Sequence, residues 1–369
     1  MMRRFVRPEI AAMAGYIPGE QPQNGEYIKL NTNENPYPAT DAIRAAIDTV
    51  LTRGLQKYPD AVAWEFRRKA GERLDVPPEW ILCGNGSDDI LTILTRTFVG
   101  PSDLLRLPTP SYILYRSLAE LQGAAWEEIP FTSDWRVSDA FTASRPAAPN
   151  EDRSVKLAFL PNPNSPTGTW IPQSEMGQLV DAMPCPLVID EAYADFVVDE
   201  HEQSQHCVGL VKRSEKAIIS RTLSKSYALA GLRFGFCVAQ PQVIEQLMKV
   251  KDSYNCDALS IAIATAAISD TTWLVENRRK ILATRRRLTD GMRRLGFDVL
   301  ESRANFTWNT HPRIAARSLY ERLRERKILV RYMNYAGFGD GLRISVGTEE
   351  QIERLLEVVG QATNGSGFC

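Results

Sequence analysis

The 369-residue sequence contains few of the residues that build metal sites and disulfide frameworks. It has three histidines, and its six cysteines form no CxxC pair: Cys83, Cys185, Cys207, Cys237, Cys256 and Cys369. Zinc sites and disulfide scaffolds need such ligands at short spacing, so we expect neither, and no metal. His201 and His206 lie in a polar stretch and are expected to be solvated. Any demanding chemistry must therefore come from an organic cofactor.

An excess of one charge and long apolar runs are missing as well. The 44 Lys and Arg residues nearly cancel the 45 Asp and Glu residues, so no overall field draws the chain to nucleic acid or to an anionic membrane. No segment has the apolar length that spans a bilayer, and residues 1–20 lack the apolar core of a signal peptide. We therefore expect a cytoplasmic protein. The basic segment 270–296 is expected to be a long helix with arginines on a solvated face, in preference to a nucleic-acid-binding surface.

Short apolar runs alternate with helical patterns along the chain. Helices are expected at 40–52, 60–74, 87–99, 113–122, 173–183 and 241–251, and strands at 80–84, 103–108, 155–160, 186–190, 216–220 and 234–239. This alternation predicts an α/β domain with a mostly parallel sheet. Strand-like runs at 297–302, 304–310, 328–333 and 342–347, with a helix at 348–362, predict a smaller α+β domain. We predict an N-terminal arm at 1–40, a large domain at 41–270 and a small domain at 271–369.

A glycine-rich turn, GNGSDD at 84–89, precedes one of the predicted helices. Such a turn leaves backbone N–H groups free at the helix start, where they can bind a phosphate. Ser87 is also a good N-cap, so a capped helix after a turn explains the stretch equally well. The P-loop pattern is missing, and the two aspartates disfavour ATP.

Polar residues follow the ends of two predicted strands. PNPNSPTG at 161–168 lies where open α/β sheets bind their ligands. Asp190 directly follows an apolar strand, and acids are rarely buried without a partner. We expect Asp190 to meet a cation or a protonated ring nitrogen, with a helix N-cap as the alternative. Tyr193 follows three residues later and can reach the same place.

Lys225 lies in RTLSKSYALAGLR at 221–233, a hydroxyl-rich turn between two predicted strands. A partly desolvated lysine loses its proton readily and can form a Schiff base. Ser224 and Arg233 nearby suit a phosphate dianion. A Schiff-base lysine, an acid for a ring nitrogen, a tyrosine and a phosphate site form the set that pyridoxal phosphate requires.

The chain resembles the pyridoxal-phosphate-dependent aminotransferases of fold type I and, among them, the histidinol-phosphate aminotransferases. The matching motifs run in family order from Tyr16 to Thr348: YIPGEQP, KLNTNENPYP, KYPD, GNGSDD, PNPNSPTG, DEAYADF, RTLSKSYALAGLR, ILVR and GLRISVGT. The resemblance implies a seven-stranded, mostly parallel sheet between helices, with a smaller α+β domain. It also implies interconversion of histidinol phosphate and 2-oxoglutarate with imidazole acetol phosphate and glutamate, a step of histidine biosynthesis.

The resemblance implies a role for each matching residue around the cofactor, pyridoxal 5′-phosphate. Lys225 is the Schiff-base lysine and proton carrier, Asp190 pairs with the pyridine nitrogen, and Tyr193 hydrogen-bonds the ring hydroxyl. Other implied cofactor contacts are the ring-stacking Tyr112 and the phosphate-binding residues Gly86, Ser87, Asp88, Ser224 and Arg233. Tyr58 reaches the phosphate in the neighbouring subunit, which implies a homodimer with shared sites.

The implied substrate contacts are Asn33, Tyr37, Arg331 and Arg343. Arg343 binds the carboxylate of the amino donor, and Arg331 helps it to bind the phosphate of histidinol phosphate. At one position the chain departs from the family, which usually has asparagine directly before PTG, in contact with the ring hydroxyl. Here this residue is Ser165, so either Ser165 makes a weaker contact or Asn164 takes the role.

Three other functions fit the same motifs. One is an aromatic or broad-specificity aminotransferase, and another is a lyase similar to threonine-phosphate decarboxylase. The third is a non-catalytic protein that binds pyridoxal phosphate. The first two differ from the leading interpretation in the substrate pocket, which one sequence does not show.

Overall fold

The computed structural model describes residues 5–14, 19–22, 27–144 and 154–364. Residues 16–18 of the YIPGEQP motif and Cys369 lie outside these ranges. Among the described residues, no single helix has the length and apolar character to cross a membrane. One pair of helices passes the same test only when both are taken together, Ala258–Ser269 and Thr271–Arg294, and it is bent by 76° at its break.

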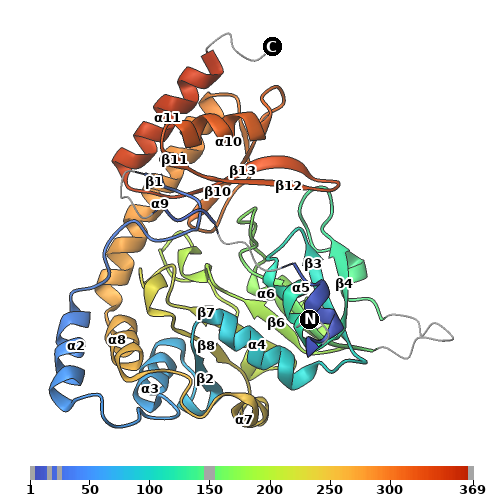
Figure 1. Cartoon of the computed structure of the whole chain (residues 1–369), viewed down its shortest axis with the longest axis vertical. Helices are drawn as coiled ribbons and strands as arrows, with labels where there is room; N and C mark the ends of the chain where they lie inside the picture. Colours follow the sequence, from blue (N-terminus) through green and yellow to red (C-terminus); the bar gives the residue numbers. More distant parts are fainter. Residues whose placement is uncertain (1–4, 15–18, 23–26, 145–153, 365–369) are drawn as a thin grey trace.

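A seven-stranded sheet forms the centre of the larger part of the chain (Figure 1). In spatial order its strands are β2 (Ile81–Gly84), β8 (Gly235–Val238), β7 (Ala217–Thr222), β6 (Leu187–Asp190), β5 (Val155–Pro161), β3 (Leu104–Thr109) and β4 (Ala125–Pro130). Only β8 runs antiparallel to its neighbours. The predicted mostly parallel sheet is confirmed. The sequence did not predict β4, because this half-exposed edge strand carries two glutamates and lacks an apolar run.

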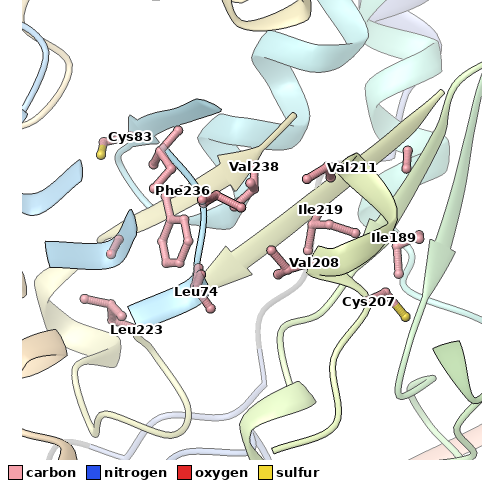
Figure 2. Close-up of a cluster of buried hydrophobic side chains, with 14 of the residues drawn as sticks. Leu74, Cys83, Ile189, Cys207, Val208, Val211, Ile219, Leu223, Phe236 and Val238 are labelled. Carbon is pink, nitrogen blue, oxygen red and sulfur yellow. The ribbon is translucent and has the colours of Figure 1, made fainter. Parts of the chain in front are cut away.

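Helices cover both faces of this sheet. One face packs on α3 (Trp64–Leu74), α6 (Gln173–Ala182) and α8 (Ala258–Ser269), and the other on α4 (Ser87–Phe98), α5 (Leu114–Gln122) and α7 (Pro241–Val250). Successive strand residues alternate between the two cores: Leu187 and Ile189 belong to the first and Val188 to the second. Figure 2 shows part of the first core, where Ile189 and Ile219 of adjacent strands lie near Val208.

The helix α8 has no counterpart in the sequence-based prediction. Its residues, ALSIAIATAAIS, are apolar or small on every side, so no helical period is visible. It packs between α2 (Ala42–Arg53) and α3, which explains why it needs no polar face.

The remainder of the chain forms a four-stranded antiparallel sheet at the other end of the molecule (Figure 1). Its strands are β12 (Arg331–Tyr335), β13 (Gly339–Ser345), β10 (Phe306–Thr310) and β9 (Asp298–Val299), with α9 (Thr271–Arg294), α10 (Ala316–Glu325) and α11 (Glu349–Asn364). From the N-terminal part comes β1 (Ile28–Lys29), which pairs in parallel with β11 (Ile328–Leu329). Leu30 belongs to the core of this end. The N-terminal helix α1 (Pro8–Ala12) lies instead beside α5 of the larger part. The predicted division into an arm and two domains stays a prediction.

One expectation about polar residues holds in part and another is wrong. Most arginines of α9 are exposed, as expected: Arg279, Arg286, Arg287, Arg293 and Arg294. Arg278 and Arg285 of α9 do not lie on a solvated face: Arg278 is buried and donates to Ser204 Oγ at 2.8 Å, and Arg285 donates to the carbonyl oxygen of Ala304 at 2.7 Å. His206 is half-buried, and burial lowers its pKa to about 4. The polar pattern of α9 hides the contacts that Arg278 and Arg285 make with other segments.

A buried ion network ties β7 to the segment after β6. Arg221 donates to Glu191 Oε2 at 2.9 Å and to Asp195 Oδ1 at 2.6 Å, and all three residues are buried. Asp195 Oδ2 also accepts from Ser226 Oγ at 2.6 Å, and Ser226 is the neighbour of Lys225. The network therefore fixes the turn that carries Lys225.

Replacing Arg221 by alanine should strongly destabilise the fold. The change leaves two buried carboxylates without their cation, which costs about 3–5 kcal/mol. Urea denaturation should show a clear fall in the midpoint of the main unfolding transition. The matched control is Arg68→Ala, because Arg68 pairs with Glu65 and Glu72 on an exposed helix face and surface pairs contribute little. Equal midpoints for the two variants would contradict this interpretation of the network.

Candidate active site

The carboxyl ends of three adjacent parallel strands bring the predicted catalytic residues to one edge of the sheet. Residues after β5 include Asn164 and Ser165, β6 leads into Asp190 and Tyr193, and β7 leads into Lys225. Asp190 is in register with Pro161 on one side and Ser220 on the other. This edge is where open α/β sheets bind ligands.

Asp190 is buried and has two fixed donors. Its Oδ2 accepts from Tyr115 Oη at 2.7 Å, and its Oδ1 accepts from the backbone N–H of Ala192 at 3.2 Å. Burial raises the pKa of its carboxyl to about 6, although both hydrogen bonds act in the opposite direction. The short 3-10 helix that follows, Ala194–Phe196, has Tyr193 at its N-cap position, so Asp190 is not the helix cap.

Tyr115 is a site residue that the sequence did not reveal. It is fully buried, stacks on Phe159 with 4.8 Å between ring centroids, and lies edge-on to Tyr112. The signal in the sequence is its spacing of three residues from Tyr112 in PSYILY, which places both rings on one side of the start of α5. Its hydrogen bond to Asp190 becomes visible only when β3, β5 and β6 are assembled.

Lys225 is partly buried, and its Nζ donates to the carbonyl oxygen of Thr32 at 3.2 Å. Burial, and next the positive charge of Arg343, lower its pKa to about 8. A lysine in this state is a better nucleophile and proton carrier near neutral pH than an ordinary lysine, because about a tenth of it is uncharged at pH 7.

Residues 31–35 of the N-terminal segment lie across the same place. The carbonyl oxygen of Asn31 accepts from Arg343 Nη2 at 2.9 Å, and Asn33 Nδ2 donates to Tyr193 Oη at 2.9 Å. Asn35 Nδ2 donates to the carbonyl oxygen of Lys225 at 3.1 Å. The predicted role of Asn33 in substrate binding stays a prediction, and the part played by Asn35 was not foreseen. The segment thus holds the side chains of Arg343 and Tyr193 and the backbone of Lys225.

A cradle for an anion lies at the start of α4. Gly86 has a φ of +89°, and a Cβ there would come within 2.7 Å of Arg233 Nη2. A Cβ on Gly235 would come within 2.5 Å of the backbone nitrogen of Ser87. Among the described residues, no acceptor pairs with the backbone N–H of Ser87 or Asp88. Gly86 itself is the N-cap of α4, so the expectation that Ser87 caps this helix is wrong.

Further polar groups surround this cradle. Arg233 Nη2 lies 3.3 Å from Asp88 Oδ2, and Tyr112 Oη donates to Asp88 Oδ1 at 3.3 Å. Ser224 is buried, and its Oγ accepts from Thr222 Oγ1 at 2.9 Å. N–H groups at a helix start, a guanidinium and two hydroxyls are a donor set that suits a phosphate.

Two arginines of the smaller sheet face this edge. Arg343 Nη1 donates to Ser165 Oγ at 2.9 Å, which connects β13 to the loop after β5. Arg331 is the register partner of Arg343 in the antiparallel pair β12 and β13, so both side chains lie on the same face. Asn164 uses its Nδ2 on Pro110 and Thr167, whereas its buried Oδ1 has no hydrogen-bond partner among the described residues.

Two predicted residues do not join the others within one chain. Tyr58 is 80% exposed and stacks on Tyr254, with 4.5 Å between ring centroids. Tyr37 packs beside α9, where Lys280 Nζ lies 5.3 Å from its ring centroid. The roles predicted for both residues stay predictions.

The comparisons with known proteins agree with this geometry. The model of the family "Aminotransferase class I and II" matches residues 25–359. The chain belongs to this family of aminotransferases. A curated relative, the histidinol-phosphate aminotransferase of Rhodopirellula baltica, is 51% identical over 96% of this chain and 95% of its own length. Histidinol-phosphate aminotransferase 1 of a Nostoc species is 42% identical over 97% of this chain and 98% of its own length.

Solved structures show the same fold. The histidinol-phosphate aminotransferase of Sinorhizobium meliloti, solved in complex with pyridoxal-5′-phosphate, superposes with a TM-score of 0.86 at 23% identity and covers 97% of each chain. A mutant of aspartate aminotransferase from Thermus thermophilus gives a TM-score of 0.80 at 20% identity, with 96% of this chain and 99% of that chain covered. The predicted fold type I architecture of this aminotransferase is confirmed.

Lys225 of the cofactor-free aminotransferase should react as an amine with a pKa near 8. Competitive labelling with acetic anhydride, followed by mass spectrometry, should give a midpoint for Lys225 near pH 8, more than two pH units below an ordinary lysine. Replacing Arg343 by leucine should raise this midpoint, because a nearby positive charge is removed. A midpoint near that of an ordinary lysine, or one that Arg343→Leu leaves unchanged, would show that the site does not control this lysine.

Proposed function

We propose that this aminotransferase transfers the amino group of glutamate to imidazole acetol phosphate, forming histidinol phosphate and 2-oxoglutarate, with pyridoxal 5′-phosphate as cofactor. The reaction is a step of histidine biosynthesis. The two curated relatives described above are named histidinol-phosphate aminotransferases, and each matches nearly the full length of the chain. The observation that carries the proposal is the convergence of Asp190, Tyr193 and Lys225 beside the anion cradle.

The residues of the site fit pyridoxal phosphate. The cradle at Gly86 leaves space that a Cβ would fill and offers N–H donors for the phosphate. Asp190 is a buried acid, and its ionised form is stabilised by a positively charged partner. A protonated ring nitrogen supplies such a charge. The buried Oδ1 of Asn164 also lacks a partner among the described residues. These are the groups that would hold the phosphate, the ring nitrogen and the ring edge.

When bound, pyridoxal phosphate supplies an electron sink that stabilises negative charge at the α-carbon of an amino compound. Lys225 would hold the aldehyde carbon through Nζ and, once released, would move a proton at the substrate's α-carbon. Its pKa of about 8 leaves Nζ able both to accept and to donate that proton near neutral pH. Asp190 would keep the ring nitrogen protonated, and Tyr115 would hold the carboxylate in the required orientation.

Arg343 and Arg331 would bind the anionic ends of the two substrates. Their shared face on β12 and β13 suits a carboxylate and a phosphate, because guanidinium groups bind both with paired hydrogen bonds. Arg343 donates a hydrogen bond to Ser165, so the neutral serine holds the arginine in place without cancelling its positive charge. Asn164 is then the better candidate for the contact with the ring hydroxyl.

We also propose that the protein is a cytoplasmic homodimer with shared active sites. Tyr58 and Tyr254 form a stacked and exposed pair, and Leu51 and Leu55 are exposed as well. Exposed aromatic and aliphatic side chains of this kind mark protein interfaces. The five described cysteines are free and buried, which suits a reducing compartment.

Histidinol phosphate should be the preferred amino donor in steady-state assays with 2-oxoglutarate. We expect its kcat/KM to exceed those of phenylalanine and of threonine phosphate by at least about 100-fold, since neither alternative offers both the ring and the phosphate. The control is Lys225→Ala, which should lose measurable turnover. A higher kcat/KM for phenylalanine would favour a broad-specificity enzyme, and carbon dioxide release from threonine phosphate would favour a lyase.

A further inference from the structure

Asn33 is held more rigidly than a substrate-binding side chain needs to be. Its side chain is only 1% exposed, and both ends of its backbone are fixed: the N–H donates to Ser345 Oγ at 2.8 Å, and the carbonyl oxygen accepts from Asn305 Nδ2 at 3.0 Å. Its φ of +55° lies in the left-handed region, which asparagine adopts more readily than most residues. Ser345 of β13 and Asn305, which directly precedes β10, therefore define one position for the backbone of Asn33.

The contacts also define which way the amide faces. The hydroxyl of Ser345 has one proton, and its oxygen already accepts from the backbone N–H of Asn33, so the proton goes to Asn33 Oδ1 at 3.0 Å. A flipped amide would point a second N–H group at Ser345 Oγ and leave the serine proton without an acceptor among the described residues. The Nδ2 group therefore faces Tyr193, and it donates to Tyr193 Oη at 2.9 Å.

The direction of the Asn33 amide determines which hydrogen bond the hydroxyl group of Tyr193 can donate. A phenol oxygen that accepts a hydrogen bond from Asn33 keeps its own proton for a different acceptor. The ring of Tyr193 is fixed edge-on against Phe306, with 5.0 Å between centroids. The relay therefore runs from the backbone of Asn33 through Ser345 and the Asn33 amide to Tyr193.

We propose that Asn33 is a positioning residue that orients this relay, so that Tyr193 acts as a hydrogen-bond donor to the ring oxygen of the bound cofactor. The proposal rests on the proposed function, because it assumes that the cofactor is pyridoxal phosphate. It replaces the predicted role of Asn33 in direct substrate binding, since both ends of its amide are engaged. It also connects β13, which carries Arg343, with the cofactor site through Ser345.

Asn33→Asp tests the relay with almost no change in shape. A carboxylate at this position accepts the proton of Tyr193, so the ring oxygen loses its donor. A donor at that oxygen stabilises its negative charge and lowers the pH at which the bound cofactor loses its proton. We expect the pH midpoint of the visible absorbance of the bound cofactor to rise by about one unit or more in this variant. An unchanged midpoint overturns the proposal.

Because the aspartate also adds a negative charge, the control is a double-mutant cycle with Tyr193→Phe. The charge acts in both backgrounds, whereas the relay exists only when the tyrosine hydroxyl is present. The relay predicts a clearly smaller shift for Asn33→Asp in the Tyr193→Phe background. Equal shifts in both backgrounds overturn it. Other charged or titratable groups that act on Tyr193 or face it, namely Arg343, Asp190, Asp88 and Tyr115, stay unchanged throughout.

A second variant keeps the proposal testable if Asn33→Asp does not fold. Ser345→Ala leaves the Asn33 amide in place but removes the hydroxyl that fixes its direction, so the midpoint should rise by less than in Tyr193→Phe. No rise at all overturns the proposal.

A measurement without the cofactor separates this proposal from the proposed function. In the cofactor-free protein, nuclear magnetic resonance of ring-labelled tyrosine can follow the ionisation of Tyr193, with Tyr193→Phe identifying its signal. This ionisation should move to higher pH in Asn33→Asp, because the group that donates a hydrogen bond to the phenol oxygen becomes an acceptor. A wild-type protein that forms no visible band with pyridoxal phosphate contradicts the proposed function. An Asn33→Asp ionisation equal to that of the wild type contradicts the relay alone.

Discussion

The parallel pairing of β5, β6 and β7 is the constraint on which the rest of the site depends. Parallel strands end at a common edge, and here Asp190 stands in register between Pro161 and Ser220. A shift of one residue in β6 would turn Asp190 to the opposite face of the sheet. The shift would also move Leu187 and Ile189 out of one apolar core and Val188 out of the other. The packing of the cores therefore fixes the geometry of the chemistry.

Burial then sets the electrostatic character of the edge. It raises the pKa of Asp190 to about 6 and lowers the pKa of Lys225 to about 8, so each group is less strongly charged than it would be in water. Such perturbed groups at the end of an open sheet are typical of an active site. Arg221 supports this arrangement from behind, because it fixes Asp195 and, through Ser226, the turn of Lys225.

Much of this could be predicted from the sequence because the signals are local. Apolar runs located the strands, and PNPNSPTG, DEAYADF and RTLSKSYALAGLR located the polar residues that follow three of them. The residues that were missed act across long separations. Tyr115 reaches Asp190 over 75 positions, and Asn35 reaches the carbonyl oxygen of Lys225 over 190. Helix α8 was missed because a helix buried on all sides carries no period. The hydrogen bond between Ser165 and Arg343 joins two sheets that the sequence does not place relative to each other.

The proposed function requires this family member to carry out one half of a transamination on histidinol phosphate without a second substrate. The most direct measurement is a single-turnover experiment, in which protein saturated with pyridoxal phosphate is mixed with excess histidinol phosphate and no 2-oxoglutarate. We expect one equivalent of imidazole acetol phosphate per subunit, after which product formation stops until 2-oxoglutarate is added. Formation of no product, or continued product formation beyond one equivalent per subunit without 2-oxoglutarate, would contradict it.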